Sequence, residues 1–478
     1  MPAPGMTRRR FLGLMAAAAA GSLLPWRPAP AEDTFSLLLL SDLHFDPFAK
    51  PELVPALQEL PAERWNDFLN RAWAGEEAVG DYGRETAYPL LESGLMAMRL
   101  AVPSPAAVVF TGDILRHDFS DYYWHHAQDP SDEDRLRFIL KTVAFFAGRL
   151  QSCFPGVPVF FTLGNNDAGC GDYRITPGRY FLSHSAATYW SLLNGLAGGQ
   201  ESFAAAFAQG GWYALDWEGL RLISLNTVYY SPKWQAGCDA ELTSDPAQTQ
   251  MSWLETELAQ ARSRGRPVWL VLHIPPGVDV YATMRSWQGG ELQDVTMMWR
   301  EPYNSRFLSL MDDYHDVLAA CFAGHTHMDD WRLPSLEAGL MNTPALNCLY
   351  GNNPGFVVLT CRRGDYLPVA RATWRIDMTD GAVRRQVAWG RSYSFTSTYG
   401  VSDLSGSSLA RAHRSLREDP ALAALYRRHY IGGHMSSAFP ADQLKGYWCG
   451  QGYLTEDDYR RAFDSLVWSR RGSVRRAA

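Results

Sequence analysis

Apolar runs of strand length alternate with stretches of helical periodicity through the first third of the chain. Residues 35–40, 106–110 and 157–163 are almost continuously apolar, whereas residues 88–101 and 135–150 carry apolar side chains at helical spacing. Strand, helix, strand, helix and strand in this order predict a βαβαβ unit, with a parallel sheet that is covered on both faces. The predicted fold class is therefore α/β, a layered α/β sandwich.

The middle of the chain predicts three more buried strands and one well-delimited helix. The three apolar strands are residues 220–225, 268–272 and 317–323. Asp245 is placed to cap a helix whose first residue is Pro246, and Gly265 follows the end of that helix. The rest of residues 168–250 mixes Gly, Ser, Tyr and Trp and is interpreted as an insertion beside a cleft.

The last third of the chain predicts strands first and helices afterwards. The alternating stretches 357–360 and 370–376 are expected to be strands of a second sheet. Beyond about residue 396 the pattern becomes helical, over residues 404–418, 420–430 and 455–470, and it ends in a basic tail at 470–476 that we expect to be solvated. We therefore divide the chain into a main domain, 32–395, and a C-terminal helical region, 396–478.

The first 31 residues are interpreted as an export signal. Residues 7–12 read Thr-Arg-Arg-Arg-Phe-Leu, an Ala-rich apolar run extends to Leu24, and a small-x-small cleavage site precedes Glu32. This segment resembles a twin-arginine signal, which predicts the twin-arginine export machinery as a partner and a periplasmic or secreted mature protein. A short membrane anchor is the alternative, but the run is shorter than the ~20 residues that a span requires. We expect no stable membrane insertion after processing.

Charge and cysteine content exclude some classes of function. The formal net charge is -7, so a basic face for duplex DNA or RNA is not expected. The seven cysteines are scattered and form no C-x-x-C motif, which argues against a disulfide scaffold and against cysteine as a metal ligand. Cys321 lies inside an apolar strand and is expected to fill the core.

Polar side chains that can bind metal ions follow the carboxyl ends of the apolar strands. In open α/β sheets ligands bind beyond these strand ends, so we expect the side chains to converge. All of them offer oxygen or nitrogen donors, a set that suits Zn, with Mn or Fe as alternatives. Taken singly, each has an ordinary structural explanation as a surface Asp, a core His or a turn Asn. The residues are Asp42, His44, Asp113, Asn165, His273, His325 and His327.

The order D-x-H, G-D, G-N-x-D, H and G-H-x-H over residues 35–327 resembles the calcineurin-like metallophosphoesterases. The resemblance implies a domain 32–395 that catalyses phosphoester hydrolysis by attack of a metal-bound hydroxide. It also implies two divalent metal ions, with Asp113 bridging them. One ion would be held by Asp42, His44 and His327, and the other by Asn165, His273 and His325.

Further motifs resemble the acid-sphingomyelinase-like phosphodiesterases within that family. These motifs are Gly112-Asp113 with His117-Asp118, Leu-Asn-Thr-Val-Tyr-Tyr at 225–230, His-Ile-Pro-Pro-Gly at 273–277 and Gly-Asn-Asn-Pro-Gly-Phe at 351–356. The resemblance implies a phosphodiesterase for phosphodiester or nucleotide-like bonds, with a small-molecule or lipid-headgroup substrate. Together with the export signal, it predicts a secreted enzyme. The mature chain leaves no room for the saposin module of true acid sphingomyelinase, which favours soluble substrates.

The sequence departs from the family pattern at one position. Where the family has Gly-Asn-His followed by Asp or Glu, this chain has Asn166, which can donate a hydrogen bond to a phosphoryl oxygen but cannot supply a proton. His117, four residues after Asp113, is then the expected acid for the leaving group, and its alternative role is to orient a metal ligand. Residues 122–126 either line the cleft, with Tyr229 and Tyr230 opposite them, or are packing aromatics on a mobile loop.

Two alternative functions stay open at this point. The first is a phosphomonoesterase such as a nucleotidase, which would use the same metal ions on a different substrate. The second is a non-catalytic protein that binds a phosphoester through its metal ions, an idea that Asn166 suggests because it replaces the expected histidine.

Overall fold

The computed structural model describes residues 33–466, apart from 77, 238–241, 243, 336, 379–382, 385–388 and 434–438. The expected export signal, 1–31, and the basic tail, 470–476, lie outside the described residues. No helix within the described ranges combines the length and the apolar character that crossing a membrane would need.

The first of two six-stranded sheets contains the predicted βαβαβ unit. Its strand order is β14-β12-β11-β1-β3-β4. The strands β1 (Thr34–Leu40), β3 (Ala107–Phe110) and β4 (Val159–Phe161) are parallel, and α4 (Tyr88–Ala101) and α6 (Asp132–Cys153) connect them. The prediction of this unit is confirmed. The other strands are β11 (Gly355–Arg362), β12 (Pro368–Arg375) and β14 (Gly390–Ser394).

The second sheet has the strand order β5-β6-β7-β8-β10-β9. Its inner strands are parallel to one another, and its two edge strands run antiparallel to their neighbours. The bounds are β5 (Tyr213–Trp217), β6 (Leu220–Ser224), β7 (Val268–Val271), β8 (Leu318–Ala323), β10 (Leu340–Asn342) and β9 (Trp331–Arg332). Outside both sheets, β2 (Ala78–Gly80) and β13 (Val383–Arg384) form a separate pair.

The expectation that residues 357–360 and 370–376 belong to a second sheet is wrong. They are strands, but β11 pairs antiparallel with β1, for example Leu37 with Leu359, and β12 pairs with β11. Both strands therefore extend the first sheet. An apolar alternating pattern predicts a strand and its buried face, but it contains no information about which neighbour completes the hydrogen bonds.

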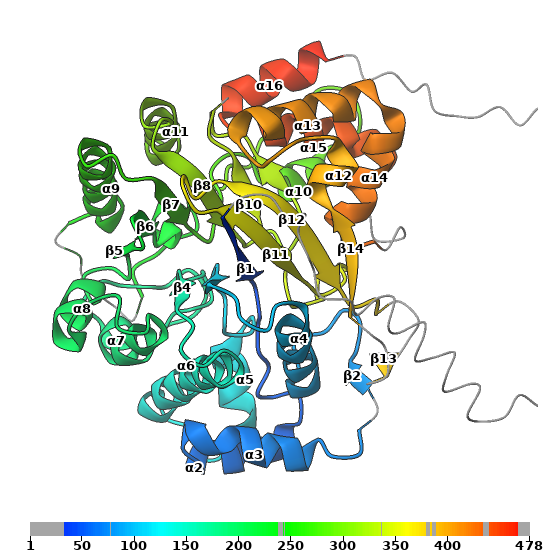
Figure 1. Ribbon diagram of the computed structural model, residues 1–478. Coiled ribbons are helices and arrows are strands. Elements are labelled where there is room, and N and C mark those ends of the chain that lie inside the picture. Colours follow the sequence, from blue (N-terminus) through cyan, green and yellow to red (C-terminus); the bar gives the residue numbers. More distant parts are fainter. Residues whose placement is uncertain are drawn as a thin grey trace, which may run out of the picture.

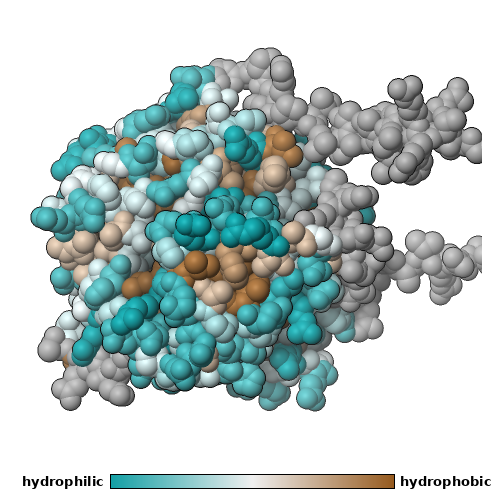
Figure 2. All heavy atoms as spheres, turned by 90° about the horizontal axis from the view of Figure 1, so that it is seen from below, coloured by the Kyte–Doolittle hydropathy of each residue, from teal (hydrophilic) through white to brown (hydrophobic). Residues whose placement is uncertain are grey.

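The two sheets pack face to face through aromatic side chains. The Phe35 ring on β1 lies 5.6 Å from the Trp217 ring and 6.2 Å from the Trp269 ring, and Phe161 lies 4.8 Å from Tyr213. Helices lie outside this sandwich: in Figure 1, α4 and α6 are below the sheets. The face seen in Figure 2 is mostly hydrophilic, with one group of apolar side chains near its middle. The site described below lies at one end of this buried layer.

Most helices surround the sandwich, and one of them begins as predicted. Asp245 accepts a hydrogen bond from the Ala247 amide (3.0 Å) and caps α9 (Pro246–Ser263). Before α9 the helices are η1 (Pro51–Leu53), α2 (Val54–Glu59), α3 (Ala62–Ala72), α5 (Phe119–His126), α7 (Tyr180–Leu192), α8 (Gln200–Phe207) and η2 (Thr227–Tyr230). After it come α10 (Val280–Ser286), α11 (Tyr303–Asp313), α12 (Phe395–Tyr399), α13 (Gly406–Glu418), α14 (Pro420–Tyr430), η3 (Ala441–Gln443), α15 (Leu444–Gly452) and α16 (Glu456–Ser465).

The C-terminal helices pack against the loops of the second sheet. The Asp329 amide donates to the Tyr430 carbonyl (2.9 Å), and the Gln451 side chain donates to Asp330 (2.7 Å). The helices therefore adjoin the loop that follows β8. Cys321 is buried in β8, as expected for a core residue, and Cys170 takes part in a disulfide.

A buried ion pair joins the two sheets beside this loop. Arg371 on β12 lies 2.6 Å from an oxygen of Asp329, and both side chains are at most 2% exposed. Thr373 donates to the other Asp329 oxygen (2.7 Å), and Arg371 also donates to the Asn342 carbonyl (2.9 Å). Each charged group thus has at least one hydrogen-bond partner besides the other, which helps to stabilise a buried charge.

Removal of the cation from this pair should destabilise the fold. We expect Arg371→Met to lower the free energy of unfolding by about 3–5 kcal/mol, because Asp329 would stay buried without a counter-charge. The control is Arg363→Met, which removes surface ion pairs with Asp33 and Glu218 in which the arginine is 43% exposed, and which should cost about 1 kcal/mol. Urea denaturation measures both, and equal small losses would contradict the prediction.

Candidate metal centre

Loops from both sheets bring the seven predicted donors together. Asp42, His44, Asp113 and Asn165 follow β1, β3 and β4 of the first sheet, and the three histidines follow β7 and β8 of the second. Backbone hydrogen bonds connect neighbouring loops. The Asp42 amide donates to the Gly112 carbonyl (3.0 Å), the His44 amide to the Asp113 carbonyl (3.1 Å) and the Gly324 amide to the His273 carbonyl (3.0 Å).

Five of these residues have a left-handed backbone. The φ angles are 46° for Asp42, 44° for His44, 62° for Asp113, 69° for His325 and 62° for His327. Positive φ is uncommon for residues other than glycine and costs on the order of 1–3 kcal/mol each when the rest of the fold enforces it. Such a concentration is typical of functional sites. The left-handed residues turn the chain sharply after the strands and direct the side chains into one space.

At two positions of the motifs only glycine fits, because side chains of a neighbouring loop lie against the backbone. A Cβ on Gly324 would overlap Ser41 Oγ and lie 2.8 Å from Asp42 Oδ2, and a Cβ on Gly164 would overlap Asp113 Oδ1. Each of these glycines therefore permits the next loop to contact a carboxylate.

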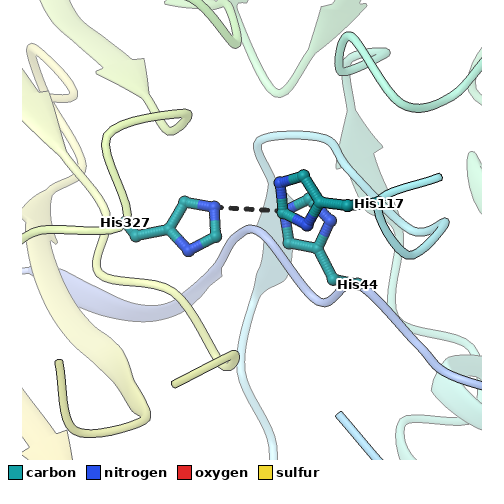
Figure 3. A group of neighbouring side chains, drawn as sticks. All are labelled: His44, His117 and His327. Atoms are coloured by element: carbon teal, nitrogen blue, oxygen red, sulfur yellow. Dashed lines mark hydrogen bonds between the residues drawn. The ribbon is translucent and has the colours of Figure 1, made fainter. Parts of the chain in front are cut away.

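The donor atoms crowd around two carboxylates. Asp113 Oδ2 lies 3.5 Å from His44 Nε2 and 3.3 Å from His273 Nε2. Asp42 Oδ1 lies 3.9 Å from His44 Nε2 and 3.6 Å from His327 Nε2. The two nitrogens His44 Nε2 and His327 Nε2 are 3.1 Å apart (Figure 3). All five side chains are buried.

The protonation of two histidines follows from their hydrogen bonds. His44 Nδ1 faces the Leu115 carbonyl (3.0 Å) and His273 Nδ1 faces the Thr111 carbonyl (2.6 Å). A carbonyl only accepts, so each Nδ1 donates and each Nε2 faces the centre. His44 is neutral and presents the lone pair of Nε2, because burial lowers its pKa to about 3. Burial alone would lower the pKa of His273 as well, but the adjacent Asp113 carboxylate outweighs it and raises this pKa to about 9, so His273 Nε2 holds a proton in the place that a cation would take.

Several of these donor atoms direct lone pairs at one another. The buried Nδ1 of His327 has no hydrogen-bond partner among the described residues. Carboxylate oxygens and imidazole nitrogens at 3.1–3.9 Å repel unless a proton or a cation lies between them. The donor set therefore fits divalent cations.

The pKa shifts have the same physical origin. Burial lowers the pKa of His44 to about 3 and the pKa values of His325 and His327 well below the usual value, so these rings are in the neutral form that binds metals. Burial also raises the pKa of Asp42, although the nearby His273 opposes the shift. For Asp113, burial is outweighed by the adjacent His273, and its pKa is lowered.

The remaining two predicted donors lie on the His273 side. Asn165 Oδ1 is 3.1 Å from His273 Nε2, and the Asn165 amide nitrogen donates to Asp172 (2.6 Å), which fixes the oxygen toward the histidine. The His325 ring lies 5.1 Å from the His273 ring, and the His325 backbone amide donates to both Asp42 oxygens (3.1 and 3.0 Å). The structure thus brings all seven predicted donors together.

Asn166 and Asp167 hold Asp113 in place. The Asn166 backbone amide donates to Asp113 Oδ1 (2.7 Å), and its side-chain amide donates to Asp113 Oδ2 (2.9 Å). The buried Asp167 accepts the backbone amides of Asp113, Ile114 and Gly164 at 2.8–3.0 Å. The Asn166 amide is therefore occupied by a carboxylate in this structure. Asp167 lies in the G-N-x-D motif, which is the signal that points to it.

His117 stacks on a predicted metal ligand. Its ring lies 4.1 Å from the His44 ring at an interplanar angle of 17° (Figure 3). Its Nδ1 is 2.8 Å from Glu85 Oε1, and its Nε2 is 3.2 Å from the Tyr350 hydroxyl. Burial alone would lower the pKa of His117, but the hydrogen bond and charge of Glu85 outweigh it, and the pKa is raised. No sequence motif indicated Glu85 or Tyr350.

A cavity of about 280 Å³ opens onto the centre. His117, Asp113, Asn165, His325 and His327 contribute to its wall. None of residues 122–126, 229 and 230 lines this cavity. Tyr123, Tyr229 and Tyr230 are fully buried and pack in the core, whereas Tyr122 and Trp124 are exposed. The aromatic wall is formed by other residues: Tyr173, Tyr281, Tyr350 and Tyr430.

The oxygen and nitrogen donors are buried at the strand ends of an α/β sandwich, and a cavity leads to them. This arrangement is that of a metal-dependent hydrolase. The profile of the calcineurin-like phosphoesterase family matches residues 35–329. This match covers more than half of the chain, and the chain belongs to that family.

Several relatives align with most of the chain. Acid sphingomyelinase-like phosphodiesterase 3b of Mus musculus is 27% identical over 87% of this chain and 86% of its own length. Cyclic GMP-AMP phosphodiesterase SMPDL3A of Mus musculus is 26% identical over 87% of this chain and 88% of its own length. Sphingomyelin phosphodiesterase B of Dictyostelium discoideum is 24% identical over 87% of this chain and 62% of its own length. Among solved structures, a dimetal phosphatase from Danio rerio aligns with 75% of this chain and 98% of its own at 13% identity, with a TM-score of 0.39.

A methyl group at Gly324 should disrupt the centre. We expect Gly324→Ala to weaken metal binding by about 10- to 100-fold, the effect typical of residues that orient metal ligands, because the methyl would displace Asp42. Gly148→Ala in α6, where the added Cβ meets nothing within 4 Å, is the control. Elemental analysis after dialysis against a metal buffer measures the difference, and undiminished metal content in Gly324→Ala would contradict the prediction.

Proposed function

We propose that this protein is an exported phosphodiesterase that uses two divalent metal ions. The observation that carries the proposal is the position of Asp113 Oδ2 between His44 Nε2 and His273 Nε2, at 3.5 and 3.3 Å, because a carboxylate so placed can serve two cations at once. The names of the relatives, all phosphodiesterases, support the diester as substrate. Export rests on the twin-arginine-like pattern at residues 7–12.

The donors divide into two sets around Asp113. The division expected from the family gives one ion to Asp42, His44 and His327 and the other to Asn165, His273 and His325, and the distances above are compatible with it. Zinc suits this mixture of imidazole and carboxylate best, with manganese or iron as alternatives. When bound, such ions neutralise phosphoryl oxygens and lower the pKa of water from about 15.7 toward ~7.

The charges of the protein favour an anionic substrate. Among the seven proposed ligands only Asp42 and Asp113 are carboxylates, so they return two of the four positive charges of two divalent ions. The centre stays cationic and attracts a phosphate group. The cavity beside it accommodates a small phosphodiester, such as a nucleotide-like molecule or a lipid headgroup.

His117 is the proposed acid for the leaving group. Its Nδ1 is bound to Glu85, whereas its Nε2 faces the cavity beside the Tyr350 hydroxyl. Nε2 is therefore the atom that delivers a proton to the departing alkoxide. Asn166 takes another role, since its amide holds the Asp113 carboxylate.

Removal of His117 should separate substrates by their leaving group. We expect His117→Ala to lower kcat/KM about 10²- to 10⁴-fold for an alkyl phosphodiester. Bis-p-nitrophenyl phosphate should lose much less, because p-nitrophenolate departs without a proton. His125→Ala, a change at an exposed histidine of α5, is the control and should affect neither substrate. Equal losses on both substrates in His117→Ala would refute the acid role.

A pair of aryl esters tests the proposed substrate class. The zinc-loaded protein should hydrolyse bis-p-nitrophenyl phosphate faster than p-nitrophenyl phosphate, and a chelator should abolish both activities. Preference for the monoester would favour the nucleotidase alternative. A metal-loaded protein that hydrolyses neither ester, but binds one of them tightly, would favour the non-catalytic alternative.

A further inference from the structure

Glu85 is a buried carboxylate that belongs to none of the metal-binding motifs. It lies in the loop between β2 and α4, and its side chain is 6% exposed. It is not among the cavity-lining residues, so it is unsuited to contact the substrate. Its carboxylate lies 2.8 Å from the imidazole of His117, and within the described chain Glu85 is the only acidic residue that forms an ion pair with His117.

Glu85 binds His117 at two points. Oε1 accepts a hydrogen bond from His117 Nδ1 (2.8 Å) and another from the His117 backbone amide (3.2 Å). Oε2 accepts the side-chain amide of Asn347 (2.6 Å). Both carboxylate oxygens are therefore occupied by donors, and the carboxylate cannot turn without losing at least one of these hydrogen bonds.

The loop that carries Glu85 is fixed to the loop that carries the metal ligands. The Thr86 amide donates to the His44 carbonyl (3.2 Å), and the Asp46 amide donates to the Thr86 carbonyl (2.9 Å). On the other side, the Asn347 amide donates to the Asp42 carbonyl (3.2 Å). The position of Glu85 is thus set by the same backbone that positions Asp42 and His44.

The stack on His44 does not decide which edge of the His117 ring faces the cavity. A half-turn of the ring about its bond to Cβ preserves the stack but exchanges Nδ1 with Cδ2 and Nε2 with Cε1. Two groups contact the ring nitrogens of His117. Tyr350, at Nε2, is 51% exposed, whereas Glu85, at Nδ1, is buried and held by Asn347. Glu85 is therefore the group that fixes the ring.

We propose that Glu85 is the positioning residue of the hydrolytic reaction, and that it holds Nδ1–H of His117 so that Nε2 faces the leaving group. This inference rests on the proposed function. As a hydroxide oxygen forms its bond to phosphorus, the bond between phosphorus and the leaving oxygen breaks. The leaving oxygen takes the electron pair of the broken bond and the proton of Nε2, and it departs as an alcohol. His117 stays hydrogen-bonded to Glu85 through Nδ1–H and regains the Nε2 proton from water. Glu85 itself exchanges no proton.

Two substitutions at Glu85 test the orientation. Glu85→Leu should lower kcat/KM for an alkyl phosphodiester by about 10- to 100-fold and leave bis-p-nitrophenyl phosphate nearly unchanged. Glu85→Gln keeps an oxygen that can accept Nδ1–H and should recover much of the loss. The matched control is Glu257→Leu, which removes from α9 a carboxylate that is 12% exposed and paired with Arg221 of β6. It should change neither substrate.

A double variant separates an effect through His117 from an effect on the fold. Because Glu85 acts only through His117, Glu85→Leu combined with His117→Ala should be no slower than His117→Ala alone. Equal losses on the two substrates, or a full additional loss in the double variant, would overturn the proposal. Metal content and thermal unfolding are measured for each variant, and loss of metal in Glu85→Gln would also overturn it.

A spectroscopic measurement keeps this inference separate from the proposed function. The ¹⁵N NMR signals of His117 should show the Nδ1–H form in the wild type and lose it in Glu85→Leu. If the wild type hydrolyses no phosphodiester, the proposed function fails, while the NMR comparison still tests the role of Glu85. An unchanged His117 signal in Glu85→Leu would show that Glu85 does not set the ring.

Discussion

The buried carboxylate of Asp113 is the constraint on which the rest of the site depends. One of its oxygens faces imidazoles from two different sheets, and both of its oxygens accept hydrogen bonds from Asn166. Asp167 fixes the loop itself through three backbone amides. A charged group in such a place is stable only if its surroundings compensate it. The Asn166 hydrogen bonds and the adjacent His273 do so in part, and bound cations would add to this compensation.

The two-sheet architecture makes this arrangement possible. The first sheet supplies the carboxylates and His44, and the second supplies His273, His325 and His327, so the centre exists only where the two sets of strand ends meet. The aromatic layer around Phe35 and Trp269 and the Asp329 ion pair hold the sheets in register. The left-handed backbone at five of the proposed ligands is strain that this packing maintains.

The sequence predicted those parts of the molecule in which local pattern and chemistry coincide. Buried strands that end in Asp, Asn or His were readable because apolar runs and strand-tip donors are both local features, and α9 was readable from its Asp245 cap. The neighbour of β11 was not readable, because pairing is decided by packing across more than 300 residues of chain. Glu85, Asn347 and Tyr350 were missed for a related reason. They lie in loops without periodicity, and their roles arise only from contacts with His117 or with one another.

The central claim is that two cations lie on either side of the Asp113 carboxylate. Anomalous diffraction from crystals of the zinc-loaded protein tests it directly. Our account predicts two peaks, one bound by His44 and His327 and the other by His273 and His325, with Asp113 between them. A single peak in a fully active enzyme, or two ions with Asp113 bound to neither, would contradict it.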